Sequence, residues 1–183
     1  MSELKRSHII GGILAALLGT FMHFTYDMSG QNSVVGVFSA VNESTFEHLK
    51  LLFFPIMLFG LLTYFIYGER YKNHSAVTLI AVLKGMAATV ISFYTYVGIL
   101  GRNFLLFDIL TFLLGMYTAF SFSYKSLKSG DKYNSNILRK VSVALIFLLI
   151  FAFGIFTFYP PQIGLFDDPT KITNCMYFPH DIF

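Results

Sequence analysis

Five long stretches of the chain consist almost entirely of apolar residues, and short polar segments separate them. A helix needs about 20 mostly apolar residues to cross the hydrocarbon core of a bilayer, and each stretch is close to that length. The stretches are 9–26, 46–67, 76–100, 104–124 and 141–159. They do not alternate with a period of two, as the strands of a membrane barrel would. Because lipid accommodates only helices and closed barrels, the pattern predicts an all-α bundle of five transmembrane helices.

Composition supports a membrane protein. Of the 183 residues, 55% are apolar and 13% are charged, whereas an average soluble domain is about 25% charged. This composition excludes a soluble globular protein and a disordered chain. The residues left over between and after the spans are too few for a further domain. We therefore expect one transmembrane domain over residues 1–183, with a tail over 160–183.

The basic residues predict the orientation of the bundle. Segments 1–8, 68–75 and 125–140 contain nine of the thirteen Lys and Arg residues, whereas 27–45, 101–103 and 160–183 contain only Arg102 and Lys171. Cytoplasmic loops are enriched in Lys and Arg, so the N-terminus is predicted to be cytoplasmic and the C-terminus outside, in the cell membrane. The net charge of +3 then follows from topology, and no nucleic-acid partner is predicted.

Small residues in the first span predict close helix packing. Gly12 with Ala16, and Ala15 with Gly19, are two pairs of small residues spaced four apart. Such pairs allow two helices to approach closely. Packing within the chain is the favoured interpretation, and an oligomer is the alternative.

The first outer loop is unusually apolar. Within loop 28–45, the centre from Val34 to Val41 is apolar but too short to cross a bilayer. A re-entrant or interfacial turn, packed among the spans, fits this pattern better than a solvated loop. The tail after Pro160 is also apolar, and we expect it to fold back over the same side.

The loop leads into a polar nonapeptide, Asn42 to Lys50, where the second span begins. Ser44 and Glu47 match the capping box S-x-x-E, in which two side chains bind free backbone N–H groups at a helix start. A capping box does not account for Glu43, His48 and Lys50. Ionisable groups at membrane depth are costly and tend to be functional. The nonapeptide is therefore the core of the candidate site.

Other polar residues of the predicted outer side are candidates for the same site. On the first span, His23 and Tyr26 share one helix face. Asp108 lies about one turn into the fourth span and is a further candidate for the site. The alternative interpretation of Asp108 is an ion pair with Arg102 or an interfacial position without a functional role. The complete set of candidate ligand-binding residues is His23, Tyr26, Asn42, Glu43, Glu47, His48 and Asp108.

Histidine and carboxylate side chains together suit zinc, iron or manganese. His23, Glu47 and His48 are the candidate ligands of a divalent metal, although the chain contains no HExxH, HxxxH or ExxH spacing. Our leading hypothesis is a membrane protein that binds a cation or small molecule, as a transporter or accessory subunit. The alternative is a metal-dependent enzyme acting on a lipid or small substrate at the outer leaflet, with Glu43 or Glu47 as general base. A structural interaction partner is the third hypothesis.

Several segments resemble a family of small bacterial multi-pass membrane proteins of unknown function. The resemblance covers 23–26, 29–30, 38–55 and 165–169, and its most specific part is Asn-Glu-Ser-x-x-Glu-His-x-Lys at 42–50. Phe46 stands where related sequences are expected to carry Trp. The resemblance implies a membrane location and brings no assigned activity.

Overall fold

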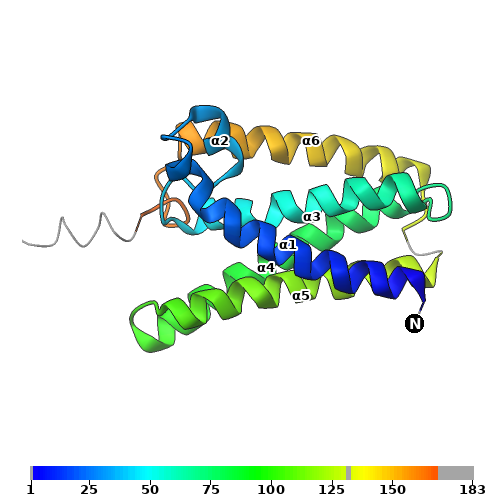
Figure 1. Ribbon diagram of the computed structural model, residues 1–183, viewed down its shortest axis with the longest axis horizontal. Coiled ribbons are helices and arrows are strands. Elements are labelled where there is room, and N and C mark those ends of the chain that lie inside the picture. The colour runs from blue at the N-terminus through cyan, green and yellow to red at the C-terminus, as the bar shows by residue number, and fades with distance from the viewer. Residues whose placement is uncertain (1, 131–132, 169–183) are drawn as a thin grey trace, which may run out of the picture.

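The chain folds into a bundle of helices (Figure 1). The computed structural model describes residues 2–130 and 133–168, and within these ranges it contains no strand. The helices are α1 (Glu3–Met28), α2 (Ser33–Phe38), α3 (Thr45–Tyr67), α4 (His74–Leu100), α5 (Leu105–Ser129) and α6 (Asn136–Phe158). All except α2 are long and apolar enough to cross a membrane. The predicted all-α bundle with five candidate spans is thus confirmed, while its orientation stays a prediction.

The helices extend beyond the apolar segments at one end of the bundle. Helix α1 begins at Glu3, α5 continues to Ser129, and α6 begins at Asn136. Helical hydrogen bonding does not stop where apolar residues stop, so a search for apolar stretches misses these polar turns. Ser2 caps the start of α1, because its hydroxyl accepts a hydrogen bond from the N–H of Lys5.

Helix α2 was not expected from the sequence. It lies within the apolar part of loop 28–45 and is only six residues long. The side chain of Asn32 starts the helix by accepting hydrogen bonds from the N–H groups of Val34 and Val35. Helix α2 packs on α1, α3 and α6 and lies at one end of the molecule.

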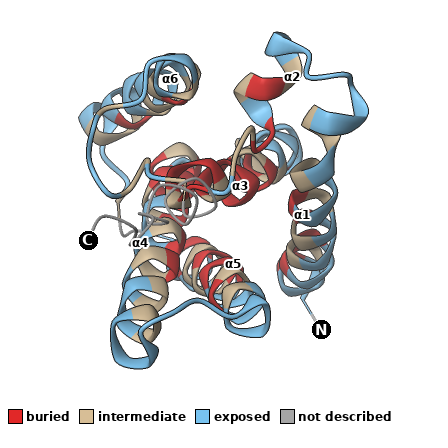
Figure 2. Cartoon of the chain, turned by 90° about the vertical axis from the view of Figure 1, so that its left-hand side faces the viewer, coloured by how far each residue is buried: buried red, intermediate tan, exposed pale blue. Residues whose placement is uncertain are grey.

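Helix α3 is the central helix of the bundle (Figure 2). It packs against α1, α2, α4 and α5, and about half of its apolar stretch is buried. Leu52 and Phe53 are almost completely enclosed. In contrast, α6 lies at the periphery, and its buried residues are Ser142 and Phe153. Most of the α6 surface is therefore an apolar face suited to lipid.

Close contact between α1 and α3 depends on small residues. Gly11, Ala15 and Gly19 form one buried stripe of α1. A Cβ atom at Gly19 would lie 2.3 Å from the carbonyl oxygen of Leu51. Pro55, one turn later in α3, has no N–H to donate to that carbonyl. The Leu51 carbonyl is therefore free of its usual helical donor on the side where Gly19 approaches.

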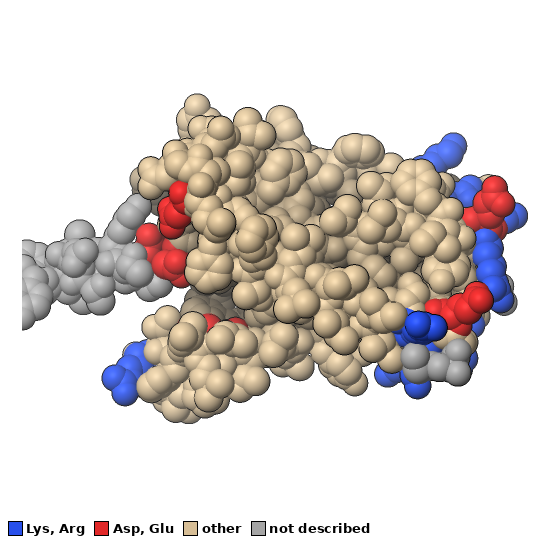
Figure 3. Space-filling model, viewed as in Figure 1, with Lys and Arg blue, Asp and Glu red and all other residues tan. Residues whose placement is uncertain are grey.

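Charged side chains gather at the two ends of the bundle (Figure 3). We call the end formed by α2, the start of α3, the α4–α5 turn and residues 160–168 the acidic end, and the opposite end the basic end. At the basic end the described residues include eight Lys or Arg and two acids, Glu3 and Glu69. The basic residues are Lys5, Arg6, Arg70, Lys72, Lys125, Lys128, Arg139 and Lys140. This separation matches the charge pattern on which the orientation was predicted.

Candidate metal centre

The start of α3 has a tightly bonded turn. Ser44 is the N-cap, and its hydroxyl accepts a hydrogen bond from the N–H of Glu47 at 3.4 Å. The side-chain carbonyl of Asn42 accepts from the N–H of Ser44 at 2.9 Å. These two bonds shape the turn and place Glu43 between them. Asn42 therefore acts on the conformation of the loop that carries Glu43.

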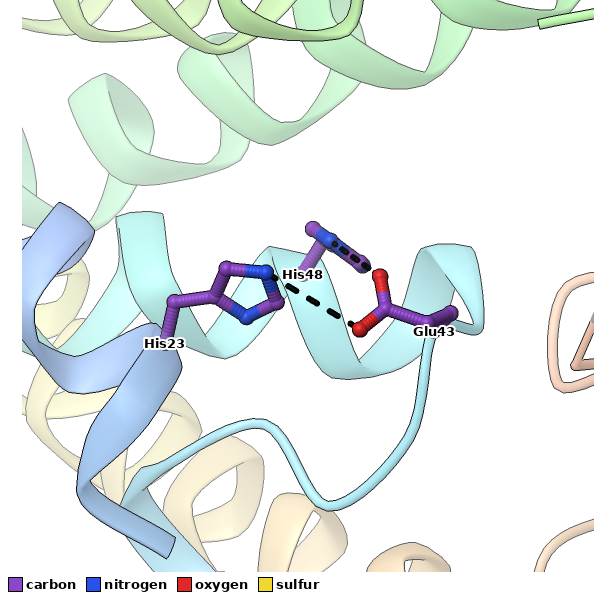
Figure 4. Close-up of side chains that lie close together, drawn as sticks. All are labelled: His23, Glu43 and His48. Carbon is purple, nitrogen blue, oxygen red and sulfur yellow. Dashed lines mark ion pairs between the residues drawn. The ribbon is translucent and has the colours of Figure 1, made fainter. Parts of the chain in front are cut away.

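Three side chains from different parts of the fold converge beside this turn (Figure 4). His23 comes from α1, Glu43 from the loop before α3, and His48 from the first turns of α3. One ligand atom from each lies within 4.8 Å of the other two. The Nε2 atoms of His23 and His48 lie 3.9 Å and 3.5 Å from the two carboxylate oxygens of Glu43. The imidazole ring centroids are 5.1 Å apart.

A hydrogen bond determines which nitrogen of His48 carries hydrogen. The Nδ1 atom of His48 lies 2.9 Å from the carbonyl oxygen of Ser44. A carbonyl oxygen only accepts, so Nδ1 donates. In the neutral ring, Nε2 then carries no hydrogen and has a lone pair. This atom lies 3.5 Å from an oxygen of Glu43. Two acceptors facing each other require a proton or a cation between them.

His23 has one ring nitrogen without a partner. Its Nδ1 atom is buried and makes no hydrogen bond to any described residue, while its Nε2 atom points towards Glu43. The side chains of His23, Glu43 and His48 are 31%, 48% and 39% exposed. The cluster is therefore partly enclosed by protein and still open to solvent.

These distances suit a zinc-like ion. Zinc binds imidazole nitrogen and carboxylate oxygen at about 2.0–2.2 Å, so two ligand atoms of a tetrahedral site are about 3.4 Å apart. The separations of 3.5 Å and 3.9 Å are close to that value, but each histidine faces a different oxygen of Glu43. A set with one ligand atom per residue lies within 4.8 Å, so the side chains would move closer together around a bound ion. Two imidazoles and one carboxylate leave a coordination position open, as in catalytic zinc sites rather than closed structural ones. The Nδ1–H bond of His48 to a carbonyl is the typical outer-shell support of a metal-binding histidine.

Glu47 does not belong to this group of ligand atoms. Its side chain is 2% exposed and pairs with the fully buried Lys50, with Oε2 and Nζ 2.5 Å apart. The same oxygen accepts a hydrogen bond from the N–H of Val41 at 2.9 Å. Lys50 also donates to the carbonyl of Gly36 and to the hydroxyl of Thr157. The pair thereby links α3 to α2, to the preceding loop and to α6. No sequence pattern indicated that Thr157 is a partner of Lys50.

The remaining candidates have partners elsewhere at the acidic end. The hydroxyl of Tyr96 donates to Asp108, and the amide of Asn103 lies 3.4 Å from the second carboxylate oxygen. Asp108 is thus held within the α4–α5 hairpin and is not part of the group formed by His23, Glu43 and His48. The ring of Tyr26 lies against α2, next to Gly36.

The described part of the tail packs on the start of α3. The carbonyl of Leu165 accepts from the N–H of Phe46 at 2.9 Å, and the Phe166 ring lies 4.4 Å from the Phe46 ring. The hydroxyl of Tyr94 lies 3.3 Å from the carbonyl of Gly164. Phe46, at the position expected to carry Trp, is therefore a packing residue. Residues 169–183, including Cys175 and His180, lie outside the described residues.

Comparison with known proteins gives a family and no activity. No curated protein and no solved structure matches the chain. The model of a family of unknown function, DUF6512, matches residues 1–175. The match covers nearly all of the 183 residues. The chain therefore belongs to the DUF6512 family of unknown function.

Proposed function

We propose that this chain is a multi-pass protein of the cell membrane that binds a divalent transition metal through His23, Glu43 and His48. One observation carries the proposal: Nε2 of His48, whose Nδ1 donates to the Ser44 carbonyl, lies 3.5 Å from a carboxylate oxygen of Glu43. The Nε2 atom of His23 lies 3.9 Å from the other oxygen of the same carboxylate. An ion between these three groups would satisfy all of them. With the predicted orientation, it would bind on the outer side.

The surroundings of the site favour a cation that exchanges with solvent. Asp27, Asp167 and Asp168 are further acids at the same end, and their charge attracts cations to it. The three ligands leave a coordination position for water or substrate. We do not propose Glu47 as a general base, because its carboxylate is enclosed and paired with Lys50. We therefore propose that the metal binds at a site that is accessible to solvent. Capture or transfer of the ion requires such access.

Isothermal titration of the detergent-purified chain with Zn²⁺ tests the proposal. The protein must carry no polyhistidine tag, because such a tag binds zinc itself. We expect one Zn²⁺ per chain, and no binding of Mg²⁺, which prefers oxygen ligands. His23→Ala, Glu43→Gln and His48→Ala should each weaken Zn²⁺ binding by about 100-fold or more, because loss of outer-shell support alone costs about 10- to 100-fold.

The control variant is Asp27→Asn, which removes an exposed acid one helical turn beyond His23. It should change the Zn²⁺ affinity by less than about threefold, since Asp27 is not one of the three ligands. If wild-type protein binds no Zn²⁺, a protonated His48 in an ion pair with Glu43 accounts for the cluster instead. Equal weakening by Asp27→Asn and His48→Ala would also contradict the proposal, because it would indicate general attraction of cations.

A further inference from the structure

A groove runs along the outside of the bundle between the first half of α1 and the second half of α5. Its volume is about 430 Å³, within the range of about 300–1,000 Å³ that is usual for ligand pockets. Apolar side chains dominate its lining, among them Ile9, Ile13 and Met116. Ile9 and Ile13 are 47% and 58% exposed, so the groove opens sideways along the helices.

Small residues of α1 create the groove. Gly12 and Ala16, one of the two pairs of small residues in this helix, line it, whereas Gly11, Ala15 and Gly19 pack towards the centre. A Cβ atom at Gly12 would come no closer than 3.4 Å to the ring of Phe120. Ordinary van der Waals space therefore exists beside Gly12, in contrast to the clash at Gly19.

The length and position of the groove match one leaflet of a bilayer. Its α1 side extends from Lys5 to Ala16, about 17 Å at 1.5 Å per helical residue. That is roughly half of the 30 Å hydrocarbon core. Lys5 lies at the basic end, and Ala16 lies near the middle of α1. The groove thus begins at one surface of the predicted membrane and ends near its midplane.

The charge of the groove differs between its two parts. At the basic end it includes the exposed Lys5, and the buried His8 together with Ser121 and Tyr124 adds polar groups along the lining. Further in, the lining is mostly apolar. Eight basic and two acidic residues occupy the surrounding end of the described chain. An amphipathic molecule with a negative head and one long apolar chain is complementary to this arrangement.

We propose that the groove binds an anionic phospholipid, with one acyl chain between α1 and α5 and the phosphate group at Lys5. The proposal rests on the membrane-spanning part of the proposed function and is independent of the metal site. The alternative to a lipid is a second copy of the chain, because small residues on a membrane helix also allow another helix to pack closely. A two-fold axis along the membrane normal would, however, bring the two Lys5 side chains and the two basic ends together, which is unfavourable.

Native mass spectrometry of the delipidated full chain tests the proposal. The probes are phosphatidylglycerol and phosphatidylcholine with identical acyl chains, added separately to protein in detergent. We expect one phosphatidylglycerol molecule per chain to be retained in preference to phosphatidylcholine. Lys5→Gln should weaken retention of phosphatidylglycerol about fivefold, the factor expected for one basic residue at an anionic lipid surface. It should leave phosphatidylcholine unaffected.

Two matched pairs of variants separate the groove from general effects. Gly12→Leu fills the groove and should reduce retention of both lipids, whereas Gly98→Leu makes the same change where a Cβ atom has nothing within 4 Å. Arg6→Gln is the charge control for Lys5→Gln, because Arg6 does not line the groove. Neither control should alter lipid retention by more than about twofold.

Three results would overturn the proposal. Equal retention of the two lipids by wild-type protein would eliminate recognition of the headgroup. Unchanged retention by Gly12→Leu would place the bound lipid elsewhere. Conversion of a wild-type dimer into a monomer by Gly12→Leu, without a change in lipid retention, would assign the groove to an interface between copies. Should Gly12→Leu fail to fold, the exposed Lys5→Gln and Arg6→Gln pair still decides the outcome.

Discussion

Glu47 and Lys50 show how much depends on single residues of the nonapeptide. Both side chains are enclosed and form an ion pair. Glu47 also accepts a hydrogen bond from Val41, and Lys50 donates to Gly36 and Thr157. Removing one partner of a buried ion pair leaves the other charge without compensation, which costs about 3–5 kcal/mol. Replacing both partners costs much less, because no buried charge remains.

We therefore expect Glu47→Gln to destabilise the protein by about 3–5 kcal/mol, and the double variant Glu47→Gln/Lys50→Met to recover most of that loss. Thermal unfolding in detergent measures both effects. The double variant should still bind Zn²⁺ with nearly wild-type affinity, because Glu47 is not among the three ligand atoms. A variant that keeps its stability and loses Zn²⁺ would instead make Glu47 a ligand.

The sequence placed His23, Glu43 and His48 in one candidate site, but it could not distinguish the glutamate beside the histidines, Glu43, from Glu47, which pairs with Lys50. The capping pattern correctly indicates Ser44 as the start of α3. The Glu47 carboxylate, however, binds the N–H of Val41 instead of returning to the N-cap. Its partner depends on how the loop before α3 folds, which no short-range spacing encodes. For the same reason, the proximity of Glu43 to His23 follows from the crossing of α1 and α3 rather than from sequence separation.

At the scale of elements, the contact between α1 and α3 sets the position of His23 relative to His48. The Leu51 carbonyl at this contact is backbone and cannot move aside as a side chain could. Gly19→Ala should therefore destabilise the protein by about 1–3 kcal/mol, the usual cost of inserting an extra methyl group into a packed contact. Thermal unfolding in detergent provides the measurement.

The control is Gly98→Ala on α4, where a Cβ atom has nothing within 4 Å. It should leave stability unchanged or raise it slightly, because alanine is a better helix former than glycine. If the two variants behave alike, the contact with Leu51 does not limit the approach of the helices.

The apolar spans could be predicted because each is long, whereas α2 is a short helix that depends on the Asn32 cap and on neighbouring helices.

At the scale of the whole molecule, the separation of charge predicts which end faces the cytoplasm. In a Cys175→Ser background, Ser29→Cys places a thiol at the acidic end and Ser129→Cys places one at the basic end, both at exposed positions. A membrane-impermeant thiol reagent should label Ser29→Cys in intact cells. It should label Ser129→Cys only after the membrane is permeabilised. The reverse pattern would invert the proposed topology and put the metal site on the inner side.

The candidate metal site also encloses a segment of the chain. His23 and His48 are 25 positions apart, and between them lie the end of α1, helix α2 and the loop that carries Glu43. An ion bound to all three ligands would act as a removable cross-link across this segment. Binding of the ion would stabilise the folded state by about 2.7 kcal/mol at an ion concentration 100 times Kd. Zn²⁺ should therefore slow amide hydrogen exchange most strongly between residues 29 and 44, and His48→Ala should abolish that protection. Availability of the ion would then control how often this end of the protein opens.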